Sequence, residues 1–144
     1  MLKHFSGPLV SVALAAASSS WASTPLAEFI GTSRVLVISS PSATDPALTR
    51  QNQWLRAGAA GLRERDLVVI RIVGNTVDTP RDFKVDTETL REAVGLKAYR
   101  FGIALIGKDG SEVLERPDSI TMESLFAEID AMPMRRQEMK RRNP

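Results

Sequence analysis

Residues 34–39 read RVLVIS and residues 67–73 read LVVIRIV, and these two apolar, β-branched runs decide the fold. Each has the length and composition of a buried strand, and the second is apolar almost throughout, as in a parallel strand covered on both faces. Between them, Asp45-Pro46 predicts a helix start, because aspartate accepts hydrogen bonds from the free N–H groups of a first turn and proline tolerates its first position. The apolar positions that follow recur at helical spacing and are expected to face the sheet: Leu48, Leu55, Ala59 and Leu62.

A second, shorter helix is expected after this β-α-β unit. Residues 74–85 are polar and irregular in pattern. Asp86 or Thr87 can then cap a short helix, and Gly95 is suited to end it.

An antiparallel hairpin and a last helix complete the pattern. Strands are expected over Phe101–Ile106 and Glu112–Arg116, joined by a turn in which Asp109-Gly110 supplies the positive φ angles of a tight hairpin. Thr121 can cap the last helix, and Pro133 bars its continuation. The order β-α-β-α-β-β-α predicts an α/β, thioredoxin-like fold, a central mixed sheet flanked by helices. A ferredoxin-like or other α/β sandwich is the alternative.

The N-terminal 22 residues have the order of a secretion signal. A basic start at Lys3 and His4 precedes an apolar stretch from Pro8 to Ala17, and Ser20-Trp21-Ala22 offers small residues for cleavage after Ala22. Cleavage after Ala17 is the main competitor. A disordered or membrane-anchoring N-terminus is the other alternative, but the stretch is shorter than the ~20 residues that span a bilayer.

We therefore expect a signal peptide at 1–22, a thioredoxin-like domain at 23–133 and a basic C-terminal tail at 134–144. The protein is expected in the periplasm or outside the cell, with no transmembrane segment in the mature chain.

The chain has no cysteine, and its one histidine is His4, within the expected signal. Thiol exchange, common zinc or copper sites, and Ser-His or Cys-His nucleophile pairs all require one of these side chains. We expect no cofactor, and the leading expectation is that the protein is not an enzyme.

The charge is concentrated at the C-terminal end. Residues 134–144 contain five basic side chains and one acid, Glu138, whereas residues 23–133 contain 13 basic and 16 acidic side chains. One interpretation is a solvated, frayed terminus. The other is a patch for an acidic partner, an anionic lipid or nucleic acid, and nucleic acid is disfavoured because the tail has no interleaved aromatic residues.

Two strings carry a resemblance to a known family. LIGKDG (residues 105–110) and IDAMPMRRQEM (residues 129–139) look like the signature of the domain of unknown function 4174 family, and the N-terminal half fits through residues 25–26, 34–37, 50–51 and 65–69. The resemblance implies a thioredoxin-like or peroxiredoxin-like fold in small exported proteins, with no settled activity. Fold alone is not evidence of function.

In thiol oxidoreductases of this architecture, the reactive cysteines follow the first strand, at the start of the first helix. Here that position reads SSPSATD (residues 39–45), with Ser39, Ser42 and Asp45 as candidate binding residues. Caps and turns explain the same residues. The cis-proline hallmark is also missing, since residues 97–101 read KAYRF.

Further candidate binding residues lie near the hairpin and the proline break. Lys108 and Asp109 form either a binding tip or a turn. The other candidate binding residues flank the break in the helix at Pro133: Asp130, Arg135 and Arg136. Three methionines tuck the tail against the domain or, as a weak alternative, bind Cu(I): Met132, Met134 and Met139. Three arginines would make an anion pocket if they converged: Arg34, Arg50 and Arg100.

The leading hypothesis is a redox-inactive binding or adaptor module of the cell envelope, whose partner is an envelope protein or an anionic surface, with no nucleic acid. The alternatives are a noncanonical thioredoxin-like oxidoreductase and a methionine-based Cu(I)-binding protein. The sequence leaves the oligomeric state open.

Overall fold

The central strand of the sheet is the first apolar run of the sequence. In the computed structural model, which describes residues 25–80 and 82–144, β1 (Arg34–Ser40) is buried along its whole length. It pairs in parallel with β2 (Leu67–Val73) on one side and antiparallel with β4 (Gly102–Ile106) on the other. The expected signal peptide lies outside the described residues.

In the part of the chain that the structure describes, the sheet has five strands in the order β3-β2-β1-β4-β5. Its edges are β3 (Thr76–Asp78), which pairs antiparallel with β2, and β5 (Glu112–Arg116), which forms a hairpin with β4. This mixed α/β sheet confirms the predicted fold class and is consistent with a thioredoxin-like fold. The strand β3 was not predicted, because it lies in the polar stretch that the pattern marks as irregular.

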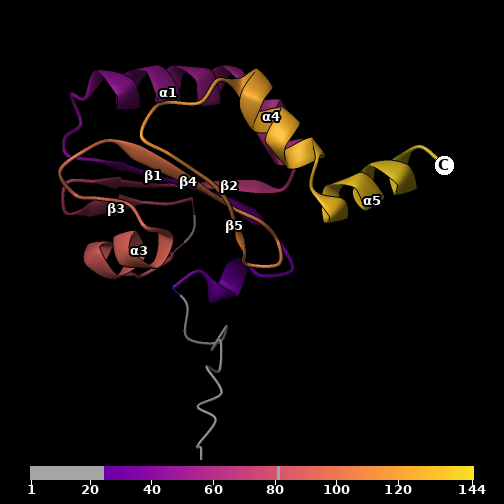
Figure 1. The fold of residues 1–144 in the computed structure, drawn as a ribbon, viewed down its shortest axis with the longest axis horizontal. Helices are drawn as coiled ribbons and strands as arrows, with labels where there is room; N and C mark the ends of the chain where they lie inside the picture. Colours follow the sequence, from indigo (N-terminus) through magenta and orange to yellow (C-terminus); the bar gives the residue numbers. More distant parts are fainter. Residues whose placement is uncertain (1–24, 81) are drawn as a thin grey trace, which may run out of the picture.

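Helices cover the two faces unequally (Figure 1). One face packs against α1 (Pro46–Ala57), α2 (Ala59–Glu64) and α4 (Met122–Asp130). Within residues 25–80 and 82–144, the helical elements on the other face are the eight-residue α3 (Thr87–Val94) and the single 3₁₀ turn η2 (Ala27–Phe29). The second face is therefore the more thinly covered one.

The predicted caps are present. The carboxylate of Asp45 accepts a hydrogen bond from Ala47 N at the start of α1, and Asp86 and Thr121 cap α3 and α4 in the same way. Gly95 ends α3 with a φ of 72°, in the left-handed region that glycine adopts without strain. None of the helices in the described ranges is long and apolar enough to cross a membrane.

The first helical segment differs from its prediction, because it is broken at Gly58 into α1 and α2. The break lies where α4 approaches most closely: a Cβ on Gly58 would stand 2.8 Å from the Met122 sulfur, and one on Gly61 would stand 2.6 Å from the Phe126 ring. The two glycines let α4 lie directly against this segment.

The C-terminal end also differs from its prediction. Pro133 does stop α4, but it occupies the first turn of a further helix, α5 (Pro133–Arg142), where a missing N–H costs nothing. The interpretation of the tail as a frayed terminus is therefore wrong. Figure 1 shows α5 beyond the end of α4, at one end of the molecule.

Candidate functional site

A buried network of charges holds α5 on the domain. Arg34, at the start of β1, is fully buried, and its guanidinium donates two hydrogen bonds to the Glu138 carboxylate of α5, at 3.1 and 3.3 Å. Its Nη1 also donates to the carbonyl of Arg65 at 2.8 Å. Lys108, in the β4–β5 turn, donates to Glu138 at 2.7 Å and to Asp66 at 2.9 Å. Glu138 thus binds one cation from β1 and one from the β4–β5 turn, and a third, Arg135 Nη1, lies 3.8 Å from its Oε2.

The second half of this network surrounds Arg135, the other nearly fully buried arginine. Its Nε donates to Asp130 at 3.0 Å, and its Nη2 donates to Glu64 at 3.0 Å. Arg65 binds the same Asp130 carboxylate in a bidentate manner, at 2.9 and 3.0 Å, and its guanidinium carbon lies 4.0 Å from the centre of the Phe126 ring. The ends of α2 and α4 are therefore tied to the first turn of α5.

We name this set of eight side chains the charged network. Its members carry four positive and four negative charges: Arg34, Arg65, Lys108, Arg135, Glu64, Asp66, Asp130 and Glu138. The charges of these eight side chains balance, although Arg34 Nε is buried without a hydrogen-bond partner among the described residues. The role of the network is to position α5.

The ionisation of the network follows from these contacts. Burial alone would raise the pKa of Glu138, but hydrogen bonds from Lys108 and Arg34, and their charges, hold it below its ordinary value of 4.5. Hydrogen bonds from Arg65, and then from Arg135, lower the pKa of Asp130 below 3.8. Burial acts to lower the pKa of Arg135, and its bonds to Asp130 and Glu64 raise it overall.

These shifts predict a loss of stability in acid. A carboxylate with a lowered pKa in the folded state contributes stability that is complete above the pKa of the unfolded chain and is lost as the pH falls through the folded value. The urea midpoint should therefore fall as the pH drops below about 5. Glu138→Gln should make this decline shallower, whereas an equally steep decline in the variant would exclude Glu138 as a cause.

Helix α5 separates its charges between two faces. Arg135, Glu138 and Met139 recur at helical spacing and are buried or half-buried, so they form the inner face. The exposed outer face carries Arg136, Gln137, Lys140 and Arg141. Within residues 25–80 and 82–144, no acid lies within 4.0 Å of Arg136, Lys140 or Arg141 in an ion pair. We call these three cations the basic face of α5.

The position that holds thiols in oxidoreductases of this architecture is occupied by internal hydrogen bonds. Ser39 is buried at the end of β1, where its Oγ accepts from Arg91 Nε at 2.8 Å. Ser42 is exposed, its Oγ lies 3.0 Å from Thr44 Oγ1, and Asp45 is the cap of α1. Asp45 and Ser42 therefore act as a cap and a turn residue, whereas the bond between Ser39 and Arg91 is neither a cap nor a turn.

The other candidate residues have separate surroundings. Lys108, Asp130 and Arg135 belong to the charged network, whereas Arg136 belongs to the basic face of α5. Asp109 accepts hydrogen bonds from the backbone N–H and hydroxyl of Ser111, as expected of a turn residue, and these bonds lower its pKa.

The anion pocket suggested by three arginines is not formed. Arg34 pairs in the sheet with Leu67, whereas Gly102, just after Arg100, pairs with Ser39 at the other end of β1. Five residues of strand separate the two ends by about 16 Å. Arg50 and Arg100 are exposed and lie over their neighbouring rings, Trp54 and Tyr99.

The three methionines of the C-terminal region are split. Met132 is buried in the core beside α4, and it lines a pocket of about 120 Å³ together with the half-exposed Met134. Met139 is on the inner face of α5 and is not part of that pocket. The expectation that methionine tucks the C-terminal region against the domain is confirmed for Met132.

Two functional side chains were missed by the sequence analysis. Arg91 is buried, and it also donates to the Gly74 carbonyl at 2.6 Å; burial lowers its pKa, against the charge of Glu88. Its position three residues before the buried Val94 on a helix could have indicated burial. Glu138, the only acid in the C-terminal run, could have been recognised as the partner of a buried cation.

Comparisons with known proteins give one family and two relatives. A family model described as "Domain of unknown function (DUF4174)" matches residues 25–138. The chain is similar to the Sushi repeat-containing protein SRPX2 of Xenopus laevis, at 27% identity over 112 residues, and to that of Rattus norvegicus, at 28% over 123 residues. These matches cover 72% and 81% of this chain but only 24% and 26% of the relatives, about a quarter of their length.

Proposed function

This chain belongs to the DUF4174 family, and from that premise we propose that it is an exported, redox-inactive binding domain that contacts an acidic protein or another anionic surface of the cell envelope through helix α5. The export part of the proposal is supported by the order of residues at the N-terminus.

The observation that carries the proposal is the separation of charge on α5. A frayed basic tail would expose Glu138 along with its cations. Instead Glu138 is neutralised inside by Arg34 and Lys108, and the exposed face of the helix is left with positive charges alone. Surface potentials of one sign steer oppositely charged partners and select against like-charged ones.

The arrangement also favours a preorganised site. Arg135 and Glu138 fix the rotation of α5 about its axis, so the basic face is displayed in one orientation before any partner arrives. Binding of a partner then does not carry the full entropic cost of ordering α5.

The redox-inactive part of the proposal is supported by chemistry rather than by the fold. The chain contains no cysteine, and the hydroxyls at residues 39–45 serve as turn and cap groups. A serine hydroxyl needs an adjacent base to act as a nucleophile. Among the described residues, Ser39 Oγ is bonded to the guanidinium of Arg91, which cannot accept a proton, and to the backbone carbonyl of Lys97. Ser40 Oγ donates to Asp45, whose carboxylate caps α1.

The test is affinity capture from a cell-envelope extract with the full chain as bait, read by mass spectrometry. The variant Arg136→Gln, Lys140→Gln, Arg141→Gln removes the basic face while keeping good helix formers. The control is Arg50→Gln, Lys97→Gln, Arg100→Gln, which removes the same charge from exposed positions outside α5.

The proposal expects a specific partner that is retained by the control and lost by the α5 variant. A partner retained by both variants would contradict the assignment of α5 and move the site to the loop at residues 39–45. If nothing is captured, the proposal of an envelope partner fails.

A further inference from the structure

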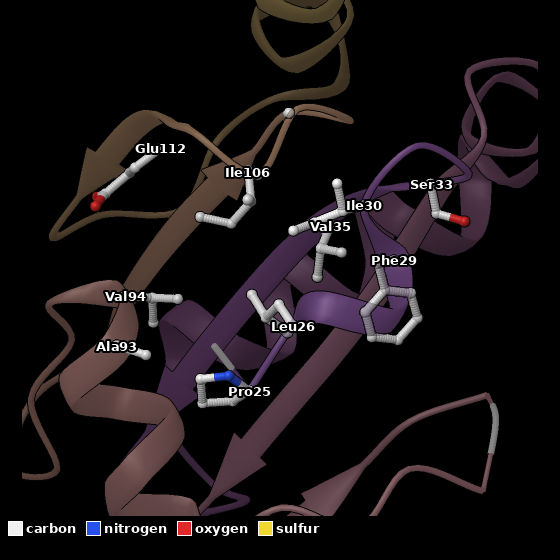
Figure 2. A pocket seen from close by; sticks show the side chains of 12 residues that line it. Pro25, Leu26, Phe29, Ile30, Ser33, Val35, Ala93, Val94, Ile106 and Glu112 are labelled. Atoms are coloured by element: carbon white, nitrogen blue, oxygen red, sulfur yellow. The ribbon is translucent and has the colours of Figure 1, made fainter. Parts of the chain in front are cut away.

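A cavity opens on the thinly covered face of the sheet, far in the sequence from α5. It lies between η2, α3 and the β4–β5 hairpin and has a volume of about 180 Å³ (Figure 2). Both helical elements that border it are short, since α3 has eight residues and η2 is a single turn. Nothing in the proposed function uses this cavity.

The walls of the cavity are mainly apolar. Side chains from η2, β1, α3 and β4 supply them, among which are Leu26, Phe29, Val35, Val94 and Ile106. An engineered cavity of about 150 Å³ with such walls stays free of water and binds benzene. One ring or branched aliphatic group fills a space of this size, whereas drug-sized ligands need at least about 300 Å³.

The rim of the cavity is acidic. Glu112 lines the cavity, and Figure 2 shows it at the edge, on β5. Glu112 pairs with Ile106 and, after a register shift, Glu115 pairs with Ala104. The shift places the two carboxylates on the same face of an edge strand. Glu115 also lies beside the end of α3, because a Cβ on Gly95 would stand 3.0 Å from its Oε2.

These two carboxylates lack a cation. Neither Glu112 nor Glu115 forms an ion pair within 4.0 Å with any lysine or arginine in the described parts of the chain. Partial burial raises the pKa of Glu112, and the charge of Glu115 and a hydrogen bond with its side chain raise it further. The C-terminal end of α3 adds a partial negative charge. A positive group bound here would relieve a repulsion that no lysine or arginine of the described residues offsets in an ion pair.

We propose that this cavity is a binding site for a small primary amine that places one apolar group of about benzene size against Val35 and Ile106 and its ammonium group beside Glu112. The carboxylate of Glu112 at the rim disfavours an anion. The cavity is poorly suited to a divalent metal, because calcium takes six to eight oxygen ligands and the apolar walls supply none.

The probe for this site is 2-phenylethylamine, titrated into the full chain and followed by NMR of the methyl groups of Val35, Val94 and Ile106. The matched anion is 3-phenylpropionate, which has the same ring and a chain of the same length. The proposal expects saturable shifts of these methyl groups with the amine and none with the anion. Equal binding of the two probes, or no binding of the amine, would overturn it.

Two variants test the two halves of the site. Glu112→Gln, on an exposed side chain, should weaken the amine about tenfold, because a charge-assisted hydrogen bond is replaced by a neutral one. Ala93→Leu, at an exposed helical position on the rim, should fill the cavity and abolish the shifts. Glu92→Gln, the control on the same helix, should bind as the natural sequence does. Unchanged affinity in both test variants would contradict the assignment.

Discussion

Replacing Glu138 by glutamine is expected to lower the free energy of unfolding by about 3 kcal/mol, because breaking a buried ion pair leaves an uncompensated buried charge. Arg34 is fully buried, and its only carboxylate partner in the charged network is Glu138. Glutamine keeps the shape and one acceptor but not the charge. This loss in the free energy of unfolding is at the lower end of the range for broken buried ion pairs, because 18% of the Glu138 side chain is exposed.

Urea denaturation of the full chain, followed by circular dichroism, measures this loss. Glu123→Gln is the control, because Glu123 lies in the first turn of α4 and has no partner in the charged network. The double variant Glu138→Gln with Arg34→Met should recover part of the loss, since it removes the buried charge as well. A Glu138→Gln protein as stable as the control would show that the network does not hold α5.

Reversing the basic face of α5 is expected to have the largest effect on binding. Each exposed charge pair is worth about 0.5–1 kcal/mol, so the loss of three corresponds to a tenfold to hundredfold weaker complex, and reversal to glutamate adds repulsion. The variant Arg136→Glu, Lys140→Glu, Arg141→Glu should therefore bind the captured partner at least about a hundredfold more weakly. Its fold should be retained, because all three side chains are exposed.

The salt dependence of the affinity of the same complex is a second test of the interface on α5. Affinity of the natural sequence should fall steeply with ionic strength, because screening acts on exposed charges beyond about 10 Å at 0.1 M salt. The glutamate variant should lose most of that dependence. Affinity that is insensitive to both salt and charge reversal would contradict an electrostatic interface on α5.

Much of the fold follows from local patterns. β1 and β2 could be predicted because apolar, β-branched runs of this length are typical of buried strands. The starts of α1, α3 and α4 could be predicted because residues that cap helices, Asp45, Asp86 and Thr121, stand directly before them. The break at Gly58 and the strand β3 could not be predicted this way. The break depends on contact with α4, which lies more than 60 residues later in the sequence, and β3 depends on pairing with β2.

The candidate site was only partly accessible from the sequence. The basic run at residues 135–142 was visible, but its division into an inner and an outer face required knowing that Glu138 meets Arg34, more than 100 residues earlier. Lys108, Asp130 and Arg135 were candidate binding residues from the sequence, and the structure places them in the charged network. The acidic rim at Glu112 and Glu115 depends on a register shift in the hairpin, which no local pattern signals.

The central claim is that the outer face of α5, and not the position of the missing thiols, meets the partner. Site-specific photocrosslinking compares the two directly, with a crosslinking amino acid placed at Gln137 between the basic residues of α5, or at Ser42 in the loop before α1. Both positions are exposed. The account predicts a crosslink to the partner from position 137 and none from position 42. A crosslink from position 42 alone would contradict it.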